Sequence, residues 1–348
     1  MIDKQRHIDL FKGIINDFYP TIIDAEYGSE GTSSLKGVLD SIQEIYKYIY
    51  AGGVNKITIF KYDDISQISS KGVPIHLTQF SSLTQYQYSS KLTIQLINGE
   101  ECYILLDDIE AEQIAKATFL YQKEKNKEYI ITGKRKNQLP NSPDIDSIFA
   151  INTFKSLDEA IEYYKTSIVK PAKCQKIRDS FINEKRLLFN PGPEHFLRDS
   201  MENFLKTRLR GNPEVRIEQT IDGSHPVDIK VSWLEAKHIA LIEIKWIGKS
   251  INFQNNIITY TDARAREGAQ QLADYLDGNF GEVPTHTTRG YLVVFDGRRK
   301  NPTNSRDNLS NADGFRFEFQ EIEFDPKHHE VRKDFNIPVR LFINPVCN

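Results

Sequence analysis

Three charged side chains stand out in two largely apolar stretches of this chain of 348 residues. Glu243 and Lys245 lie in residues 240–246, and Asp228 lies in residues 227–233, where apolar residues occupy every second position. Side chains alternate between the faces of a β-strand, so Glu243 and Lys245 emerge on the same face. Charges that face a protein interior are costly unless they are paired or hold a metal. Two adjacent strands would bring an aspartate, a glutamate and a lysine together, as metal-dependent hydrolysis of a phosphodiester requires.

That reaction needs a nucleophilic water, a charge-stabilised phosphorus and a protonated leaving group. Hard divalent cations held by carboxylate and carbonyl oxygens supply the first two. We therefore expect Asp228 and Glu243 to bind one Mg²⁺ ion, for which Mn²⁺ would substitute. Lys245 would orient or deprotonate the water and offset phosphate charge. Glu218, on the preceding predicted strand, and Glu194, at the start of a predicted helix, are further candidate acidic ligands.

The spacing of these residues resembles that of the PD-(D/E)XK nuclease superfamily. The resemblance consists of Asp228, of Glu243-Ile244-Lys245 fifteen residues later, and of Gln271-Leu-Ala-Asp-Tyr275, which looks like the Q-x-x-x-Y helix of the RecB-like branch. In the family a proline usually precedes the aspartate directly, whereas here Val227 separates Pro226 from Asp228. The resemblance covers about residues 190 to 300 and says nothing about the first half of the chain.

The resemblance implies a Mg²⁺-dependent nuclease on a restriction-endonuclease-like αβββαβ core, a mixed sheet flanked by helices. It implies that the main-chain carbonyl of Ile244 is a third metal ligand, that Gln271 takes part in catalysis and that Tyr275 contacts the substrate. Arg264 and Arg266 lie near the start of the same predicted helix. We expect them to bind substrate phosphate, because a helix N-terminus and basic side chains both favour an anion.

The elements predicted around these motifs follow the order that such a core requires. Helical spacing of apolar residues predicts the helices, and short apolar or alternating runs predict the strands. The predicted elements are, in order, a helix over 194–209, strands over 215–221, around Asp228 and around Glu243, a helix over 263–276, and strands over 290–296, 315–324 and 339–343. The agreement between motif and order of elements supports an α/β fold for the second half.

The first half has the pattern of an α+β domain whose role the sequence does not define. The predicted elements are helices over 8–19, 35–50 and 108–123 and strands over 56–60, 92–96, 102–106, 129–132 and 148–151. Asn98-Gly99 is a strong hairpin signal between two of these strands. We therefore expect an α+β domain over 1–150 that senses, recognises or binds a partner, a helical connector over 151–189 and a nuclease-like domain over 190–348.

Composition narrows the class of protein further. The net charge is −3, so binding to a phosphate backbone must come from local basic patches rather than from the overall charge of the protein. Three widely spaced cysteines argue against a disulfide framework or a zinc cluster and favour a reducing cytoplasm. No stretch approaches the roughly 18 apolar residues of a transmembrane helix. The first residues lack the layout of a signal peptide, so we expect no membrane partner.

The sequence therefore predicts a Mg²⁺-dependent endonuclease, with DNA as the expected substrate because most of the superfamily that it resembles acts on DNA. RNA stays open. By analogy, a role in bacterial antiviral defence or restriction is expected, in which the N-terminal half binds a regulatory protein or a small-molecule activator. A homodimer is expected, since cutting both strands usually takes two sites. The alternatives are a non-catalytic nucleic-acid- or protein-binding module on a nuclease-like fold and a buried ion-pair cluster without function.

Overall fold

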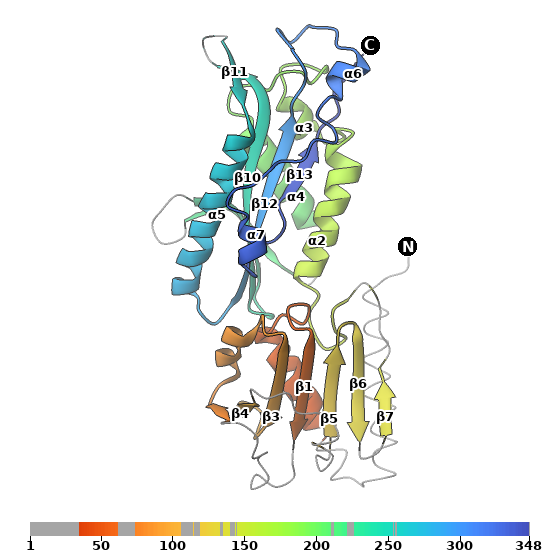
Figure 1. Ribbon diagram of the computed structural model, residues 1–348, viewed down its shortest axis with the longest axis vertical. Coiled ribbons are helices and arrows are strands. Elements are labelled where there is room, and N and C mark those ends of the chain that lie inside the picture. The colour runs from red at the N-terminus through yellow and green to blue at the C-terminus, as the bar shows by residue number, and fades with distance from the viewer. Residues whose placement is uncertain are drawn as a thin grey trace. The chain divides into compact units, whose positions relative to one another are not determined.

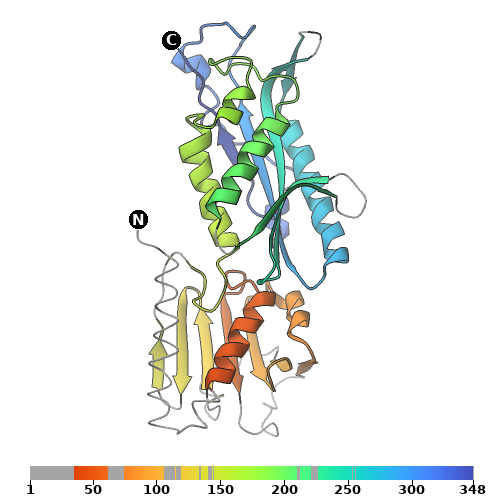
Figure 2. The same ribbon diagram turned by 180° about the vertical axis from the view of Figure 1, so that it is seen from behind.

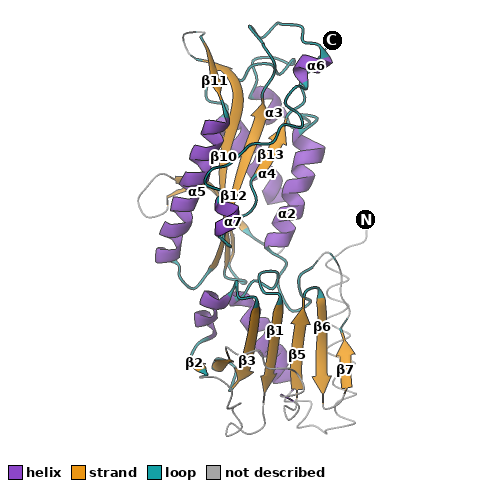
Figure 3. Ribbon diagram, in the orientation of Figure 1, coloured by secondary structure: helices purple, strands orange, loops and turns teal. Residues whose placement is uncertain are grey.

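The computed structural model describes residues 35–61, 74–105, 114, 119–132, 135–139, 143, 145–209, 212–220, 226–252, 254 and 256–347. The chain forms two compact units. The first contains Met1–Lys155, Glu235–His238 and Thr285–Thr287, and the second contains Ser156–Leu234, Ile239–Pro284 and Thr288–Asn348. Each unit has a mixed β-sheet flanked by helices, which confirms the predicted α/β class (Figure 3). Of the helical connector predicted over 151–189, residues 156–189 belong to the second unit.

The first unit is built on a seven-stranded sheet. Its strands are β1 (Lys56–Lys61), β2 (Ile75–Leu77), β3 (Lys91–Leu96), β4 (Cys102–Leu105), β5 (Phe119–Glu124), β6 (Lys127–Thr132) and β7 (Arg135–Gln138). Their spatial order is β2-β4-β3-β1-β5-β6-β7, and β1 pairs parallel with β3 and antiparallel with β5. A helix over 35–48 and a 3₁₀ turn, Phe80–Tyr86, pack against the sheet through a cluster that includes Leu35, Ile42, Ile59, Ile94 and Ile104.

Several predictions for this unit are confirmed and two are wrong. The helix at 35–48 and strands β1, β3, β4 and β6 lie where the sequence predicted them, and Asn98-Gly99 joins an antiparallel hairpin. The predicted helix over 108–123 is wrong at its end, because Phe119–Glu124 is strand β5 and is buried at five successive positions. Such a run does not distinguish a buried strand from a helix. Residues 148–150 form a bend instead of a strand, and the predicted helix over 8–19 lies outside the described residues.

The second unit contains the sheet that carries the candidate site. Its strands are β8 (Glu214–Thr220), β9 (Pro226–Trp233), β10 (His238–Ile251), β11 (Ile257–Tyr260), β12 (Thr287–Gly297) and β13 (Val339–Phe342). The order in space is β13-β12-β10-β9-β8, with β11 paired antiparallel to the end of β10 (Figure 1). Its helices are α2 (Phe154–Tyr163), which continues as a π-helix to Val169, α3 (Gln175–Asp179), α4 (Glu194–Arg208), α5 (Asp262–Glu282), α6 (Asn311–Gly314) and α7 (His328–Val331).

Helices cover both faces of this sheet. The apolar side of α5, which includes Ala265, Ala269 and Leu272, packs with Leu241 of β10 and Leu292 of β12. Helices α2 and α4 lie over the other face, which faces the viewer in Figure 2. The central strand β10 is therefore buried along most of its length, and the polar groups on it lie in the protein interior.

The predicted α-β-β-β-α-β order is confirmed as α4-β8-β9-β10-α5-β12, with β11 as an addition between β10 and α5. The strand predicted over 315–324 is wrong. Its alternating phenylalanines resemble a strand, but Arg340 bonds the carbonyls of Phe317 and Glu318, and Arg298 bonds that of Gln320. Arginine side chains thus take the place of a neighbouring strand. In the part of the chain that the structure describes, no helix is long and apolar enough to cross a membrane.

Candidate active site

Neighbouring strands β9 and β10 bring the three predicted charged residues together. The main-chain N–H of Ile244 donates a hydrogen bond of 2.8 Å to Asp228 Oδ2, so the aspartate lies against the strand that carries Glu243 and Lys245. Lys245 Nζ donates to Glu243 Oε1 at 2.6 Å. The exposed fractions are 9% for Asp228, 3% for Glu243 and 8% for Lys245. The cluster is therefore a buried group of two carboxylates and one ammonium.

The alternation of β10 explains why the glutamate and lysine share a side of the sheet. Leu241 and Ile247 on the same side of the strand belong to the apolar cluster beneath α5. Glu243 and Lys245 lie between them in the alternation and so point toward α5, into an apolar layer. A charged pair in such a place has to be compensated locally, because little solvent reaches it.

Helix α5 approaches the lysine closely at Gly268. A Cβ atom at this position would lie 2.5 Å from Lys245 Cγ and 3.0 Å from Lys245 Cε. Only a glycine leaves room for the lysine stem between strand and helix. The sequence analysis did not single out Gly268, although a glycine inside a helical pattern is a signal of close packing.

Burial changes the protonation of both carboxylates. Burial raises the pKa of Asp228 to about 6, while the Ile244 N–H and Lys245 act in the opposite direction. Burial, followed by the negative charge of Asp228, raises the pKa of Glu243 to about 8, and Lys245 opposes this shift. Desolvation exceeds the attraction of the lysine for both groups. Both carboxyl groups therefore hold their protons more tightly in the folded protein than in water, and a bound cation would favour their ionised forms.

One oxygen of the site has no partner. Glu243 Oε2 is buried and accepts no hydrogen bond from any residue that the structure describes. A buried acceptor without a donor is costly and calls for an explanation, such as an ion that the side chain binds in the functional state.

The candidate ligand Glu194 lies beside this cluster, where it is paired with Arg264. Its charge contributes to the raised pKa of both Asp228 and Glu243, so it is close to both. Arg264 Nη2 donates to Glu194 Oε2 at 2.6 Å, and the two side chains are 28% and 30% exposed. The guanidinium of Arg264 also lies over the rings of Trp246 and Tyr260, at 5.3 and 5.1 Å. Arg264 is thus held at the margin of the site.

The other predicted residues of α5 lie on two faces of the helix. Gln271 and Tyr275 follow Gly268 at spacings of three and four and so share its face. Tyr275 is buried and its hydroxyl donates to the carbonyl of Pro226 at 3.3 Å, while Gln271 is exposed between the other two. The structure does not bring Arg266 to the cluster, because its Nε donates to the carbonyl of Glu323. Two residues beyond Arg264, it lies on the opposite face of the helix.

Glu218 pairs with a residue that the sequence analysis missed. Its carboxylate accepts a hydrogen bond from Arg198 Nη1, and Arg198 lies one helical turn after Glu194 on α4. The positive charge of Arg198 also acts on Asp228. Charge and position on a helix face were the only signals for Arg198 in the sequence, because its partner lies on another element.

The donor set fits a hard divalent cation. No group of three or more His, Cys, Asp or Glu side chains in the described segments is arranged as a ready metal site. Mg²⁺, however, usually keeps several waters and takes one or two protein carboxylates. Asp228 and Glu243 supply two such carboxylates, and a cation would give the buried Glu243 Oε2 the partner that no described residue provides.

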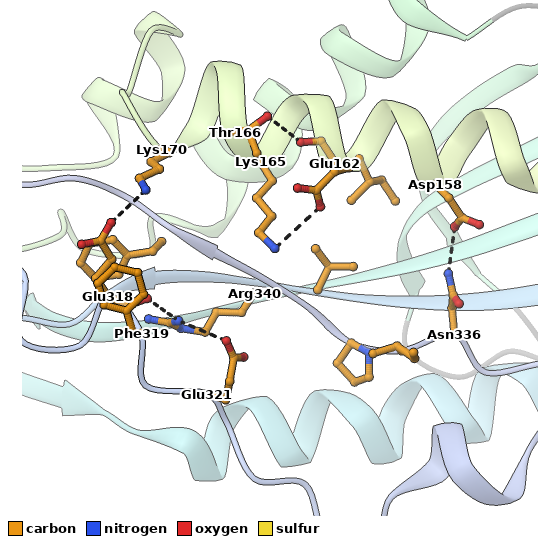
Figure 4. A pocket seen from close by; sticks show the side chains of 15 residues that line it. Asp158, Glu162, Lys165, Thr166, Lys170, Glu318, Phe319, Glu321, Asn336 and Arg340 are labelled. Atoms are coloured by element: carbon orange, nitrogen blue, oxygen red, sulfur yellow. Dashed lines mark hydrogen bonds and ion pairs between the residues drawn. The ribbon is translucent and has the colours of Figure 1, made fainter. Parts of the chain in front are cut away.

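A hollow elsewhere in the same unit does not have these properties. It has a volume of about 550 Å³ and lies beside α2 and β13 (Figure 4). Its charged side chains pair with one another, including Lys170 with Glu318 at 2.9 Å and Lys165 with Glu162 at 3.7 Å. The ammonium groups that could bind an anion there are already compensated.

No protein-family model, curated protein or solved structure matches this chain. What the chain does must therefore be argued from the geometry of Asp228, Glu243 and Lys245 and of the charged pairs around them.

Proposed function

We propose that the second unit is a Mg²⁺-dependent nuclease of the PD-(D/E)XK type that hydrolyses DNA, with Asp228, Glu243 and Lys245 as its active site. The observation that carries the proposal is the buried pair of carboxylates with an unpartnered oxygen on Glu243, next to a lysine on the same strand. An ion-pair cluster that only stabilised the fold is expected to satisfy both oxygens of a buried carboxylate, because each unsatisfied one costs free energy.

Asp228 and Glu243 would hold the metal, with the carbonyl of Ile244 as a third oxygen ligand. When bound, Mg²⁺ supplies positive charge for the phosphate oxygens and lowers the pKa of water. Lys245 has its stem packed against Gly268 and its ammonium beside Glu243. From there the ammonium would orient the attacking water and offset charge on the phosphate, whereas in its neutral form the amine would accept the proton of the water. Gln271, which is exposed on the same face of α5, would contact the substrate, and the buried Tyr275 would position β9 through its hydrogen bond to the carbonyl of Pro226.

Arg264 would bind a phosphate neighbouring the one that is cut. Its guanidinium is held over Trp246 and Tyr260 and makes its ion pair with Glu194 at a half-buried position. A phosphodiester oxygen can replace a carboxylate oxygen at such a guanidinium, because both accept the same planar pair of N–H donors. Glu194 would then be free to bind a metal-coordinated water or a second cation.

The proposal is tested by cleavage of supercoiled plasmid, linear duplex, single-stranded DNA and RNA with the purified full chain. Each substrate is incubated with Mg²⁺, Mn²⁺ or EDTA, beside a Glu243→Ala variant prepared in the same way. We expect cleavage of DNA with either metal, none in EDTA and none by the variant. Cleavage that persists in Glu243→Ala would come from another site or a contaminant and would reject the assignment. Preferential cleavage of RNA would keep the site and change the substrate.

Gly268→Ala provides a finer test of the position of Lys245. Alanine has the higher helix propensity, by up to about 1 kcal/mol, but its Cβ would displace the lysine stem. We expect overpacking to lower the free energy of unfolding by about 1 to 3 kcal/mol, which leaves the chain folded, and the cleavage rate to fall by about 10-fold or more. Gly281→Ala on the same helix is the matched control, because a Cβ there meets nothing within 4 Å. If both variants cleave like the wild type, the close approach at Gly268 is not needed for activity.

A further inference from the structure

Arg198 and Glu218 form a second arginine–glutamate pair beside the candidate site, and the proposed function gives this pair no role. Arg198 Nη1 donates to Glu218 Oε1, and the arginine side chain is 15% exposed while the glutamate is 57% exposed. The Nε atom of Arg198 is buried without a hydrogen-bond partner among the residues described. One of the strong donors of this guanidinium is therefore unused.

The backbone of Glu218 is in an unusual conformation. Its φ angle is +50°, in the left-handed region that a residue with a side chain adopts at a cost of about 1 to 2 kcal/mol. In the antiparallel register of β8 and β9, Ile217 pairs with Ile229 and Gln219 with Val227. Glu218 therefore falls opposite Asp228. The pairing is regular on both sides of this position, so the strain is confined to the residue that faces the aspartate.

Electrostatics explains why a regular strand is disfavoured there. Side chains directly opposite one another on antiparallel strands lie on the same face, and like charges in such pairs are destabilising. An extended Glu218 would point its carboxylate along that of Asp228. The left-handed conformation is compatible with a carboxylate that meets Arg198 instead, and the ion pair offsets part of the backbone cost. The ion pair with the strained Glu218 thus holds the guanidinium of Arg198 close to Asp228.

Helix α4 places Arg198 within reach of the site. Residues 194 and 198 are four apart on α4, so their side chains are neighbours on one helix face. Glu194 acts on both site carboxylates, and Arg198 acts on Asp228. The guanidinium therefore lies at the margin of the same cluster, with Arg264 held at the margin by the same kind of ion pair.

The charges of the site and its two flanking pairs favour an anionic substrate once a metal is present. Asp228, Glu243, Glu194 and Glu218 carry four negative charges when ionised, and Lys245, Arg198 and Arg264 carry three positive charges, a net charge of −1. Arg198 also lies 3.8 Å from Asp199, but Asp199 is paired with Lys176 at 2.9 Å, so these two further charges cancel and the net charge stays at −1. A divalent cation brings the set to +1, and one phosphodiester then brings it to zero. Before the metal ion binds, Glu194 and Glu218 offset the charges of the two arginines, so these do not repel it. After it has bound, the guanidinium groups are free to attract the substrate phosphate.

We propose that Arg198 is a DNA-phosphate-binding residue of this site and that Glu218 holds its guanidinium until the phosphate replaces the carboxylate. This inference rests on the proposed nuclease function and adds a substrate contact to it. The exchange conserves the number of ion pairs, because the phosphodiester takes over both the charge and the hydrogen bonds that Glu218 supplies. It also releases Glu218 from the side chain that favours its left-handed backbone.

Binding of a short, fluorescently labelled DNA duplex to the full chain tests this role by anisotropy at several salt concentrations. Ca²⁺, which takes the same oxygen ligands, replaces Mg²⁺ so that binding is measured apart from cleavage. Arg198→Ala should weaken binding about 10-fold and reduce the slope of log K against log[salt] by about 0.9, as the loss of one phosphate contact requires. Arg198→Lys should restore part of the slope, because it keeps the charge without the planar donors.

Glu218→Gln should change binding in the opposite direction. The glutamine no longer competes for the guanidinium, so affinity should rise several-fold, and this gain should disappear when Arg198→Ala is added. Arg216→Ala is the matched control, since Arg216 lies on β8 in an exposed pair with Glu214. It should leave both affinity and slope near the wild-type values.

Two results would overturn the assignment of Arg198. One is an unchanged salt slope in Arg198→Ala at an unchanged melting temperature, which would show that the arginine only positions Glu218 and does not bind phosphate. The other is an equal loss in Arg216→Ala, which would reflect a general loss of positive charge. Either result, obtained with a wild-type chain that cleaves DNA, leaves the proposed function intact. A wild-type chain that neither binds nor cleaves DNA would remove both.

Discussion

Lys245→Ala is expected to lower the rate of Mg²⁺-dependent DNA cleavage by about 1000-fold, the size of effect that a lost proton-transfer or charge-stabilising group produces. The lysine is 8% exposed, and its ammonium lies 2.6 Å from Glu243 Oε1. Its stem has almost no freedom between β10 and Gly268. A group fixed in this way acts without reorganisation at the moment of reaction, so no nearby lysine can replace it.

The loss should appear in kcat rather than in the affinity for DNA. Lys249→Ala is the control, because Lys249 lies four residues later on β10 and its ammonium donates to the carbonyl of Pro302, away from the carboxylates. It should cleave at nearly the wild-type rate. Single-turnover cleavage at saturating protein measures the chemical step for both variants. Equal rates for Lys245→Ala and Lys249→Ala would show that the lysine beside Glu243 does not take part in the reaction.

The positions of Asp228, Glu243 and Lys245 could be predicted because each depends on one local rule. Apolar residues at every second position predict a strand, and a strand sends alternate side chains to the same face. The connection between β9 and β10 is short, so the two strands are expected to be neighbours. Their pairing brings Asp228, Glu243 and Lys245 into one cluster. Helix α4 could be predicted for a similar reason, since Leu197, Met201 and Leu205 repeat with helical spacing and are all buried.

The two flanking ion pairs could not be predicted, because each joins elements that are distant in sequence. Glu194 meets Arg264 across seventy residues, and Arg198 meets Glu218, whose backbone is left-handed, across twenty. A strand pattern gives no sign of that single irregular residue. The sequence therefore predicts Glu218 as one further candidate metal ligand, whereas in the structure its carboxylate is paired with Arg198.

The misassigned segments show the same limit. Phe119–Glu124 is buried at five successive positions, so its apolar residues have no period that separates strand from helix. Residues 315–324 alternate like a strand, but their carbonyls are bonded by Arg298 and Arg340, which are anchored in turn on the buried Asp296. Local alternation cannot indicate that the hydrogen-bonding partners of a backbone will be side chains.

Asp228→Asn is expected to stabilise the metal-free protein at pH 8 by up to about 3 kcal/mol while abolishing its response to Mg²⁺. Burial raises the pKa of Asp228 from its ordinary value of 3.8 to about 6, so the folded state holds this proton more tightly than the unfolded state. The corresponding stabilisation is present below about pH 4 and is lost as the pH rises through 6. Above that pH, the ionised and buried aspartate destabilises the fold, and asparagine removes this cost.

Glu243 extends the pH range of the effect. Its pKa is raised from 4.5 to about 8, so its contribution to the free energy of unfolding also decreases as the pH rises through this range. In EDTA, the free energy of unfolding of the wild type should therefore decrease from pH 4 to pH 8. The decrease should be smaller in Asp228→Asn, both because one titrating group is gone and because its charge no longer raises the pKa of Glu243.

Urea denaturation in EDTA and in Mg²⁺, at pH 5 and pH 8, measures both parts of the prediction. Because the carboxylates must lose their protons to bind a cation, Mg²⁺ should stabilise the wild type more at pH 8 than at pH 5. Asp274→Asn is the control, since Asp274 is exposed on α5 and accepts a hydrogen bond from Gln270. A variant Asp228→Asn that is less stable than the wild type in EDTA at pH 8 would mean that the aspartate serves the fold through its bond to Ile244. Greater stability combined with loss of the Mg²⁺ effect would mean that the fold tolerates a buried, repulsive pair of carboxylates because a cation normally lies between them.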